Sequence, residues 1–237
     1  DVYIQNRSDK TFDAADLSGP VSTFITPDIA PTVLIVHTHG SEAYTMPPGE
    51  EYVPSGDCRT TDTDCNTGRV GEEIAKTLEE AGLSVLHDTT LHDYPEYSGA
   101  YGRSLTSVEN YLKQYPTISF VLDVHRDALV SEDGAAYKLI SQEGDEKVAQ
   151  VMLVVGSDAS GASHPRWQEN LALAVKLQLL LTGQYDQLAR PITLRSTRFN
   201  QDTSPGALLV EVGGHGNTLA EAVAGGKKFA QTAGELL

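Results

Sequence analysis

The sequence has few basic residues and no long apolar run. Its 237 residues include 17 Lys and Arg against 33 Asp and Glu, for a formal net charge of −16. Nucleic-acid binding depends on Lys and Arg that displace counterions from phosphates, so this composition argues against a nucleic-acid partner. No apolar stretch approaches the roughly 18 residues of a transmembrane helix. With 40% hydrophobic residues, the chain is predicted to form a globular core with no membrane span.

Cysteine is also scarce. The only two, Cys58 and Cys65, lie in the polar stretch CRTTDTDC, which is typical of a loop. Two cysteines with none left over suit an exported protein, so the sequence favours a disulfide between them over two unrelated thiols. A zinc site on this pair is disfavoured, because no second CxxC or HxxxH pattern accompanies it. The chain begins at Asp1 without a Met or an apolar leader, and we expect a trimmed or mature fragment.

Apolar β-branched runs alternate with helical patterns along the chain. We predict strands at 32–36, 83–86, 120–125, 137–140, 151–155 and 207–212, and helices at 69–81, 104–115, 166–182 and from about 219. Residues 1–30 are polar and are predicted to be an irregular lead-in to a domain at 31–237. The alternation predicts a three-layer α/β fold: a mostly parallel twisted sheet flanked by helices on both faces.

Residues suited to metal chemistry follow or end three of these strands. Ligand sites in such folds collect at the carboxyl ends of strands, where the chain places His39 and His125. Two imidazoles and a carboxylate suit zinc, and catalytic zinc takes three protein ligands and leaves one position for water. We predict Glu42, three residues after His39, as the third ligand. His37 shares the strand face of His39 and either replaces it or supports it.

A carboxylate also interrupts the last apolar strand. Glu211 lies in LLVEVGG, and an unpaired buried carboxylate is costly, so we expect it to be paired, protonated or functional. A Glu beside metal-bound water is the usual general base of metal-dependent hydrolysis, and we predict this role for Glu211. Arg126 and Asp127 follow His125. They either orient ligands and hold substrate carboxylates or form a surface ion pair.

In this order the motifs resemble the zinc-dependent N-acetylmuramoyl-L-alanine amidases of bacterial cell walls. The residues concerned are THG at 38–40, VHRD at 124–127 and LVEVG at 209–213, with Asn217 after them. The closer resemblance is to the stage II sporulation protein P family of spore-forming bacteria. It is carried by VHTHGSEAY (36–44), RVGEEIAKTLEEAG (69–82), HDTTLHDYPEYSGAYGRS (87–104), LDVHRD (122–127), MLVVGSD (152–158), ENLALAVKL (169–177), FNQD (199–202) and ALLVEVGG (207–214).

The resemblance implies a zinc-dependent peptidoglycan hydrolase that acts during sporulation engulfment. It would cleave the amide between N-acetylmuramic acid and L-alanine, and an endopeptidase activity on stem cross-links is a further expectation. The resemblance also implies an extracytoplasmic location on the mother-cell side of the septum, a membrane anchor upstream of Asp1, and sporulation protein D, a lytic transglycosylase, as partner. General amidases carry the zinc-binding Glu at the start of the first helix. This chain has no Glu at 63–66, so Glu42 is the expected replacement and Asp64 the alternative.

Position along the chain indicates further contacts with substrate. We expect Arg126, Asn200 and Arg103 to bind carboxylates or carbonyls of the peptide stem. Tyr44 and Tyr52, on the long loop after the first strand, are candidates for stacking on glycan, whereas Trp167 is expected in the core.

Two other functions remain open from the residues alone. One is a catalytically inactive module of the same fold that binds cell wall or a partner. It has little reason to keep Glu211 in an apolar strand. The other is a zinc carboxypeptidase, which predicts cationic groups arranged to bind a terminal carboxylate.

Overall fold

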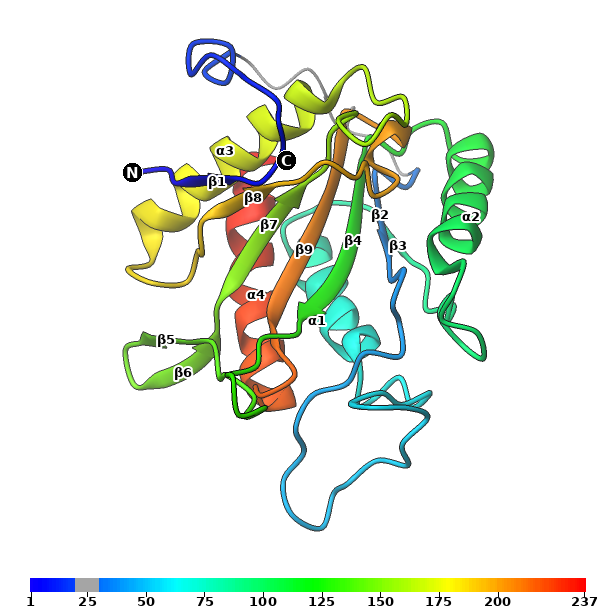
Figure 1. Ribbon diagram of the computed structural model, residues 1–237, viewed down its shortest axis with the longest axis vertical. Coiled ribbons are helices and arrows are strands. Elements are labelled where there is room, and N and C mark those ends of the chain that lie inside the picture. Colours follow the sequence, from blue (N-terminus) through cyan, green and yellow to red (C-terminus); the bar gives the residue numbers. More distant parts are fainter. Residues whose placement is uncertain (20–29) are drawn as a thin grey trace.

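One seven-stranded sheet organises the protein (Figure 1). The computed structural model describes residues 1–19 and 30–237. The elements in chain order are β1 (Ile4–Asn6), β2 (Val33–Val36), α1 (Thr67–Glu80), β3 (Val85–His87), α2 (Ala100–Gln114), β4 (Phe120–Asp127), β5 (Ile140–Glu143), β6 (Glu146–Ala149), β7 (Val151–Val155), α3 (Trp167–Gln184), β8 (Ile192–Leu194), a 3-10 turn (Gln201–Thr203), β9 (Gly206–Gly214) and α4 (Leu219–Leu236). None of the helices in these described ranges is long and apolar enough to cross a membrane.

The strand order is β1-β8-β7-β9-β4-β2-β3, and β7 and β9 are the one antiparallel pair in it. The sheet is therefore mostly parallel, as predicted, but consists of two parallel halves that run in opposite directions. The carboxyl ends of β2, β4 and β9 lie at the same edge as the amino end of β7.

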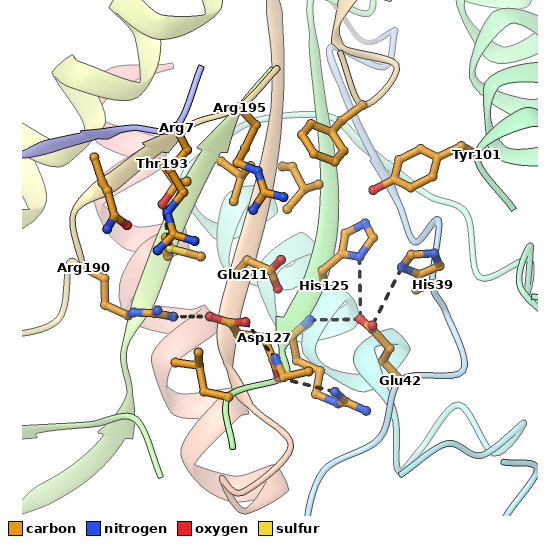
Figure 2. A pocket seen from close by; sticks show the side chains of 18 residues that line it. Arg7, His39, Glu42, Tyr101, His125, Asp127, Arg190, Thr193, Arg195 and Glu211 are labelled. Atoms are coloured by element: carbon orange, nitrogen blue, oxygen red, sulfur yellow. Dashed lines mark hydrogen bonds and ion pairs between the residues drawn. The ribbon is translucent and has the colours of Figure 1, made fainter. Parts of the chain in front are cut away.

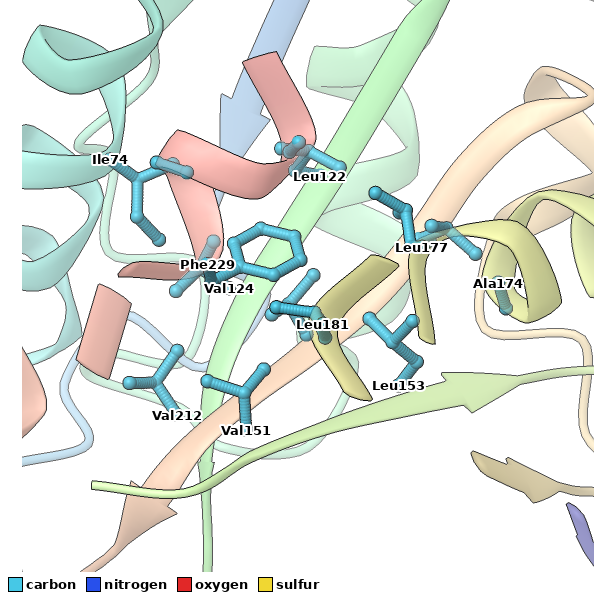
Figure 3. Packing of buried hydrophobic residues seen from close by; sticks show 14 of the residues in the cluster. Ile74, Leu122, Val124, Val151, Leu153, Ala174, Leu177, Leu181, Val212 and Phe229 are labelled. Atoms are coloured by element: carbon cyan, nitrogen blue, oxygen red, sulfur yellow. The ribbon is translucent and has the colours of Figure 1, made fainter. Parts of the chain in front are cut away.

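Helices cover both faces, but unequally. Alternate residues of β2, β4, β7 and β9 pack against α1, α3 and α4, and the core there includes Ile74, Leu122, Val124, Val151, Leu153, Leu177, Leu181, Val212 and Phe229 (Figure 3). Each large apolar side chain buried in this way contributes about 1.5–3 kcal/mol. The opposite face carries only α2, which packs over β2 and β4 through a smaller cluster that includes Val36, Val108 and Val121. The three-layer prediction is confirmed, and among residues 1–19 and 30–237 no helix packs on the part of this face beyond α2.

Local signals set the helix boundaries. The Asn66 side chain accepts a hydrogen bond from Gly68 N at the start of α1. Gly82, with φ of +93°, follows the end of this helix. Thr218 and Glu221 form a reciprocal capping box that starts α4. Trp167 is 7% exposed and belongs to the core, as expected.

Several predictions of elements are wrong. Ile4–Asn6, in the predicted irregular lead-in, pair with β8 as β1. The strand predicted at 137–140 begins only at Ile140, and it pairs with β6 in a separate hairpin. The strand β8 was not predicted, because three residues are too short to show periodicity. The division at residue 30 stays a prediction, since 20–29 lie outside the described residues.

The disulfide predicted between Cys58 and Cys65 is also wrong, since both thiols are free. Each sulfur instead faces a carboxylate close in sequence: Cys58 Sγ lies 3.6 Å from Asp57 Oδ1, and Cys65 Sγ lies 3.7 Å from Asp62 Oδ2. The loop is held by backbone hydrogen bonds instead, among them Ala43 N to Cys58 O at 3.0 Å.

The close approach of α4 to β6 depends on Gly225. A Cβ there would lie 2.3 Å from the carbonyl oxygen of Ala149, and backbone cannot move aside as a flexible side chain can. We expect Gly225→Ala to lower the free energy of unfolding by about 1–3 kcal/mol. The matched control is Gly102→Ala in α2, where a Cβ meets no atom within 4 Å and the change is expected to add about 0.4–1 kcal/mol. Urea titrations measure both, and equal stabilities would contradict this account of the α4 contact.

Candidate metal centre

Two histidines and a glutamate converge at the carboxyl ends of β2 and β4 (Figure 2). His39 lies in the turn after β2, and Glu42 N donates to His39 O, which brings the two side chains together. His125 extends from β4. One ligand atom from each of these residues lies within 4.8 Å of the others. Glu42 oxygens are 3.8 Å from His39 Nδ1 and 3.6 Å from His125 Nδ1.

The Glu42 carboxylate stays ionised although it is buried. Burial alone would raise its pKa, but the contact with His125 and the charge of Arg126 lower the pKa below its ordinary value. Arg126 N donates to Glu42 Oε2 at 3.2 Å, and Arg59 Nη2 is 3.7 Å from Oε1. Glu42 therefore offers a negatively charged oxygen to the space between the two imidazoles.

His125 is held in place by Asp123, which lies two residues before it on the same face of β4. Asp123 Oδ1 is 2.9 Å from His125 Nε2, and Asp123 also accepts hydrogen bonds from Thr38 N and Thr38 Oγ1. Burial would lower the pKa of His125, but Asp123 and Glu42 raise it well above its ordinary value. Because this buried imidazole lies between two carboxylates, its positively charged form is favoured. The Asp123 contact leaves Nδ1 of His125 directed at Glu42.

Glu211 lies next to this cluster, because β4 and β9 pair with His125 opposite Glu211. Its Oε2 is covered and has no hydrogen-bond partner. Burial raises the pKa of Glu211 to about 8, with His125 opposing and Glu42 adding to the shift. The side chain faces a cavity of about 320 Å³ on the half of the sheet that α2 leaves uncovered.

The alternative ligands lie elsewhere. His37 uses both ring nitrogens, with Nδ1 2.9 Å from Val124 O and Nε2 2.8 Å from His87 Nε2. Asp64 is exposed in the loop before α1 and is not part of the cluster. The structure thus brings Glu42, and not Asp64 or His37, to His39 and His125.

The three predicted peptide-binding residues are engaged with the chain itself. Arg103 binds the carbonyl oxygens of His92, Ser98 and Glu96 and does not line the cavity. Asn200 donates to Tyr101 O and Ser104 Oγ from the neighbouring turn. Arg126 lines the cavity, but its guanidinium donates to the carbonyls of Ala43 and Cys58. Through these contacts the three side chains stabilise the loops around the site.

Aromatic residues at the cavity differ from those expected. Tyr44 is 1% exposed and donates to Val212 O, so it cannot stack on glycan. Tyr52 is half-buried on the long loop. Tyr97, 55% exposed, stacks on His39 with ring centroids 4.7 Å apart, and Tyr101 lies edge-on to the same ring.

The far side of the cavity carries residues that the sequence interpretation missed: Gln5, Arg7, Arg190, Thr193 and Arg195. They flank or belong to β1 and β8, the two short strands that periodicity does not reveal. Alternation of Gln5 with Arg7, and of Thr193 with Arg195, is the one signal that points to a shared face. Asp127, which was singled out, pairs with Arg190 at 2.8 Å.

Glu211→Gln is expected to stabilise the metal-free protein increasingly as pH rises. The folded-state pKa of Glu211 is about 8, above the ordinary 4.5. Its favourable contribution is therefore complete below about pH 4.5 and is lost as pH rises to about 8, by at most about 1.4 kcal/mol per pH unit. The amide does not titrate. Denaturant titrations with a chelator at several pH values measure the difference; Glu132→Gln, at an exposed site, is the control. A pH-independent difference would contradict the raised pKa.

Comparison with known proteins identifies the sequence family. The profile of the family described as Stage II sporulation protein P matches residues 5–233. The Stage II sporulation protein P of Bacillus subtilis (strain 168) is 26% identical over 200 residues, which are 80% of this chain and 47% of that protein. This chain thus spans about half the length of its curated relative.

Solved structures with a related arrangement are amidases. The CwlD amidase from Clostridioides difficile, in complex with the GerS lipoprotein, has 13% identity and a TM-score of 0.49 over 85% of this chain and 93% of that one. An N-acetylmuramoyl-L-alanine amidase from Clostridium difficile 630 has 15% identity and a TM-score of 0.48 over 88% and 96%. Both scores are below 0.5, so the assignment rests on the sequence profile, which extends over nearly the whole chain. The chain belongs to the Stage II sporulation protein P family.

Proposed function

We propose that this protein is a zinc-dependent peptidoglycan hydrolase of sporulation that cleaves the amide between N-acetylmuramic acid and L-alanine. The observation that carries the proposal is the convergence of His39, Glu42 and His125 beside Glu211 in an open cavity. Membership of a sporulation family agrees with it. The bond that we propose is the one implied by the resemblance of the sequence motifs to those of N-acetylmuramoyl-L-alanine amidases.

The donor set fits zinc. Two imidazole nitrogens and one carboxylate oxygen are typical ligands of catalytic zinc, and the ionised Glu42 and the doubly flanked His125 supply the negative surroundings that a dication needs. Asp123 holds the His125 ring in the orientation that directs Nδ1 at Glu42. When bound, the metal would polarise the scissile carbonyl and acidify a water molecule.

Glu211 is the proposed proton carrier. Its side chain lines the cavity beside His125, so it is placed to accept a proton from the attacking water. A base whose pKa lies near the working pH also returns the proton readily to the leaving amine. The raised pKa and the position opposite His125 suit both steps.

The shape of the cavity suits an extended substrate. The site lies on a sheet face that no helix covers beyond α2 among the described residues. Tyr101 lines the cavity and Tyr97 stacks on His39, and aromatic rings of this kind can stack on sugar faces. A polymer can therefore lie across the sheet, as hydrolysis of sacculi requires.

A zinc carboxypeptidase is the second candidate, and a specific observation favours it: Arg7 and Arg195 line the same cavity as the candidate ligands. Such an enzyme would shorten stem peptides from their carboxyl ends and leave the bond to muramic acid intact. The catalytically inactive module is disfavoured by Glu211, because a binding protein gains nothing from a half-buried carboxylate whose covered oxygen has no partner among the described residues.

Other parts of the proposal follow from the family. We propose residues 31–237 as the catalytic domain, an extracytoplasmic location with an anchor outside these residues, sporulation protein D as partner, and endopeptidase activity on cross-links. These features concern the whole protein, of whose curated relative this chain matches 47%.

The central prediction concerns Glu211. Purified protein with zinc is expected to release stem peptides with free L-alanine amino groups from sacculi, and chelation should abolish release. Glu211→Gln should lower kcat by about 10²–10⁴-fold while the protein stays folded. Glu132→Gln, at an exposed site, should act as wild type. Full activity of Glu211→Gln would overturn the catalytic assignment, and products shortened only from the carboxyl end would favour the carboxypeptidase.

Asp123 gives an independent prediction about the metal. Asp123→Asn is expected to weaken zinc binding about 10–100-fold, because the amide no longer fixes His125 as the carboxylate does. Competition with a chromophoric chelator measures the affinity. Asp186→Asn, an exposed carboxylate outside the site, is the control. Equal zinc affinity of the Asp123 variant and wild type would argue against His125 as a ligand oriented by Asp123.

A further inference from the structure

Two exposed arginines, Arg7 and Arg195, line the cavity on the side opposite the candidate ligands, and neither has a side-chain partner among residues 1–19 and 30–237. We propose that Arg7 and Arg195 form an anion subsite that binds free carboxylates of the stem peptide while its amide lies at His39, Glu42 and His125. This inference rests on the proposed function, and it adds a determinant of specificity that the family match does not assign.

The register of the edge strands makes the two residues neighbours. β1 and β8 are parallel, with Gln5 opposite Thr193 and Asn6 opposite Leu194. The next pair in this register is Arg7 and Arg195, and Arg7 N donates to Leu194 O at 2.8 Å. Side chains alternate along a strand, so the two arginines share the face of Gln5 and Thr193, and all four line the cavity. Figure 2 shows Arg7 and Arg195 on the side of the cavity away from His39 and Glu42, with Arg195 nearer to Glu211.

Neither guanidinium has a carboxylate partner within residues 1–19 and 30–237. The other two arginines of the cavity are engaged: Arg190 with Asp127 at 2.8 Å, and Arg126 with backbone carbonyls. The chain has 33 acidic residues and 17 basic ones, so an unpaired pair of arginines is not a result of too few carboxylates. The fold leaves these two cations available.

Placing the two cations side by side is unfavourable unless an anion joins them. Both arginines are exposed, so water weakens their repulsion, but like charges on neighbouring segments still repel each other. A carboxylate bound between them would remove the repulsion, and the planar guanidinium matches its two oxygens with paired hydrogen bonds. Thr193 and Gln5 supply neutral polar groups next to the pair for the amides of a peptide.

The span of the cavity fits a peptide and not a single small anion. Three strand intervals, or about 14 Å, separate β8 from β4. A ligand that contacts both the arginines and the candidate metal ligands must span a part of this distance. An extended peptide advances about 3.3–3.6 Å per residue, and arginine side chains shorten the gap. The bound carboxylate would therefore lie a few residues beyond the scissile amide, where stem peptides carry free carboxylates.

The test measures binding of a stem tripeptide, L-Ala-γ-D-Glu-diaminopimelate, which has no muramic acid and so lacks the amide that the proposed activity cleaves. Isothermal titration with chelator-treated protein compares wild type with Arg7→Gln/Arg195→Gln. We expect at least a tenfold loss of affinity in the double variant. Arg166→Gln, an exposed arginine outside the cavity, should bind as wild type. The same tripeptide with all carboxylates amidated should bind weakly and equally to all three proteins.

Equal affinity of wild type and the double variant for the acidic tripeptide would overturn the subsite, as would an equal loss with the amidated peptide. Thermal unfolding separates binding from folding: the double substitution removes a repulsion, and its midpoint should not fall. Digestion of sacculi separates the two proposals. A raised KM with kcat nearly unchanged supports the subsite, whereas wild-type protein that binds tripeptide but releases nothing from sacculi overturns the hydrolase proposal alone.

Discussion

The pairing of β4 with β9 is the constraint on which the site depends. Its register sets His125 opposite Glu211, and because side chains alternate, it also sends Asp123, His125 and Asp127 to one face while Leu122 and Val124 enter the core. One face of β4 thus packs into the core, and the other face carries residues of the candidate site. A shift of the pairing register by one residue would turn the apolar side chains to the cavity and the polar ones to the core. Burial of the apolar side chains therefore fixes the positions of the polar ones.

An incomplete third layer turns this polar side into a cavity. α1, α3 and α4 cover one face of the sheet completely enough to build the main core, whereas α2 covers β2 and β4 only. The sheet face beyond α2 would be an aggregation hazard if it were apolar. Instead it mixes the apolar Met152, Val154 and Leu209 with Thr193, Glu211 and the arginines. The uncovered face therefore offers both apolar and charged contacts to a ligand, and the main core lies on the other face.

The sequence predicted the half of the site that lies on long elements. β4, β9 and α1 have strong periodicity, and His125, Glu211 and the helix stop at Gly82 could be read from it. The turn after β2 was predicted from three-residue spacing alone. Hydrogen bonding by the chain itself cannot be read from the sequence: Arg103 and Asn200 were expected at the substrate, and they bind carbonyls and a hydroxyl of neighbouring turns. Their contact with substrate stays a prediction. Three-residue strands such as β1 and β8 leave no periodic signal, so the sequence did not indicate that Arg7 and Arg195 lie at the site.

The two ends of the cavity carry opposite charges. At one end the ionised Glu42 and Asp123 flank His125 and favour a cation. At the other end Arg7 and Arg195 favour an anion. A substrate with a neutral amide at one point and carboxylates a few residues away is attracted in one orientation and repelled in the reverse one, because its carboxylates would then meet Glu42. The chain has a net charge of −16, but one end of its cavity is positively charged. The charges inside the cavity, and not the net charge, therefore select the ligand.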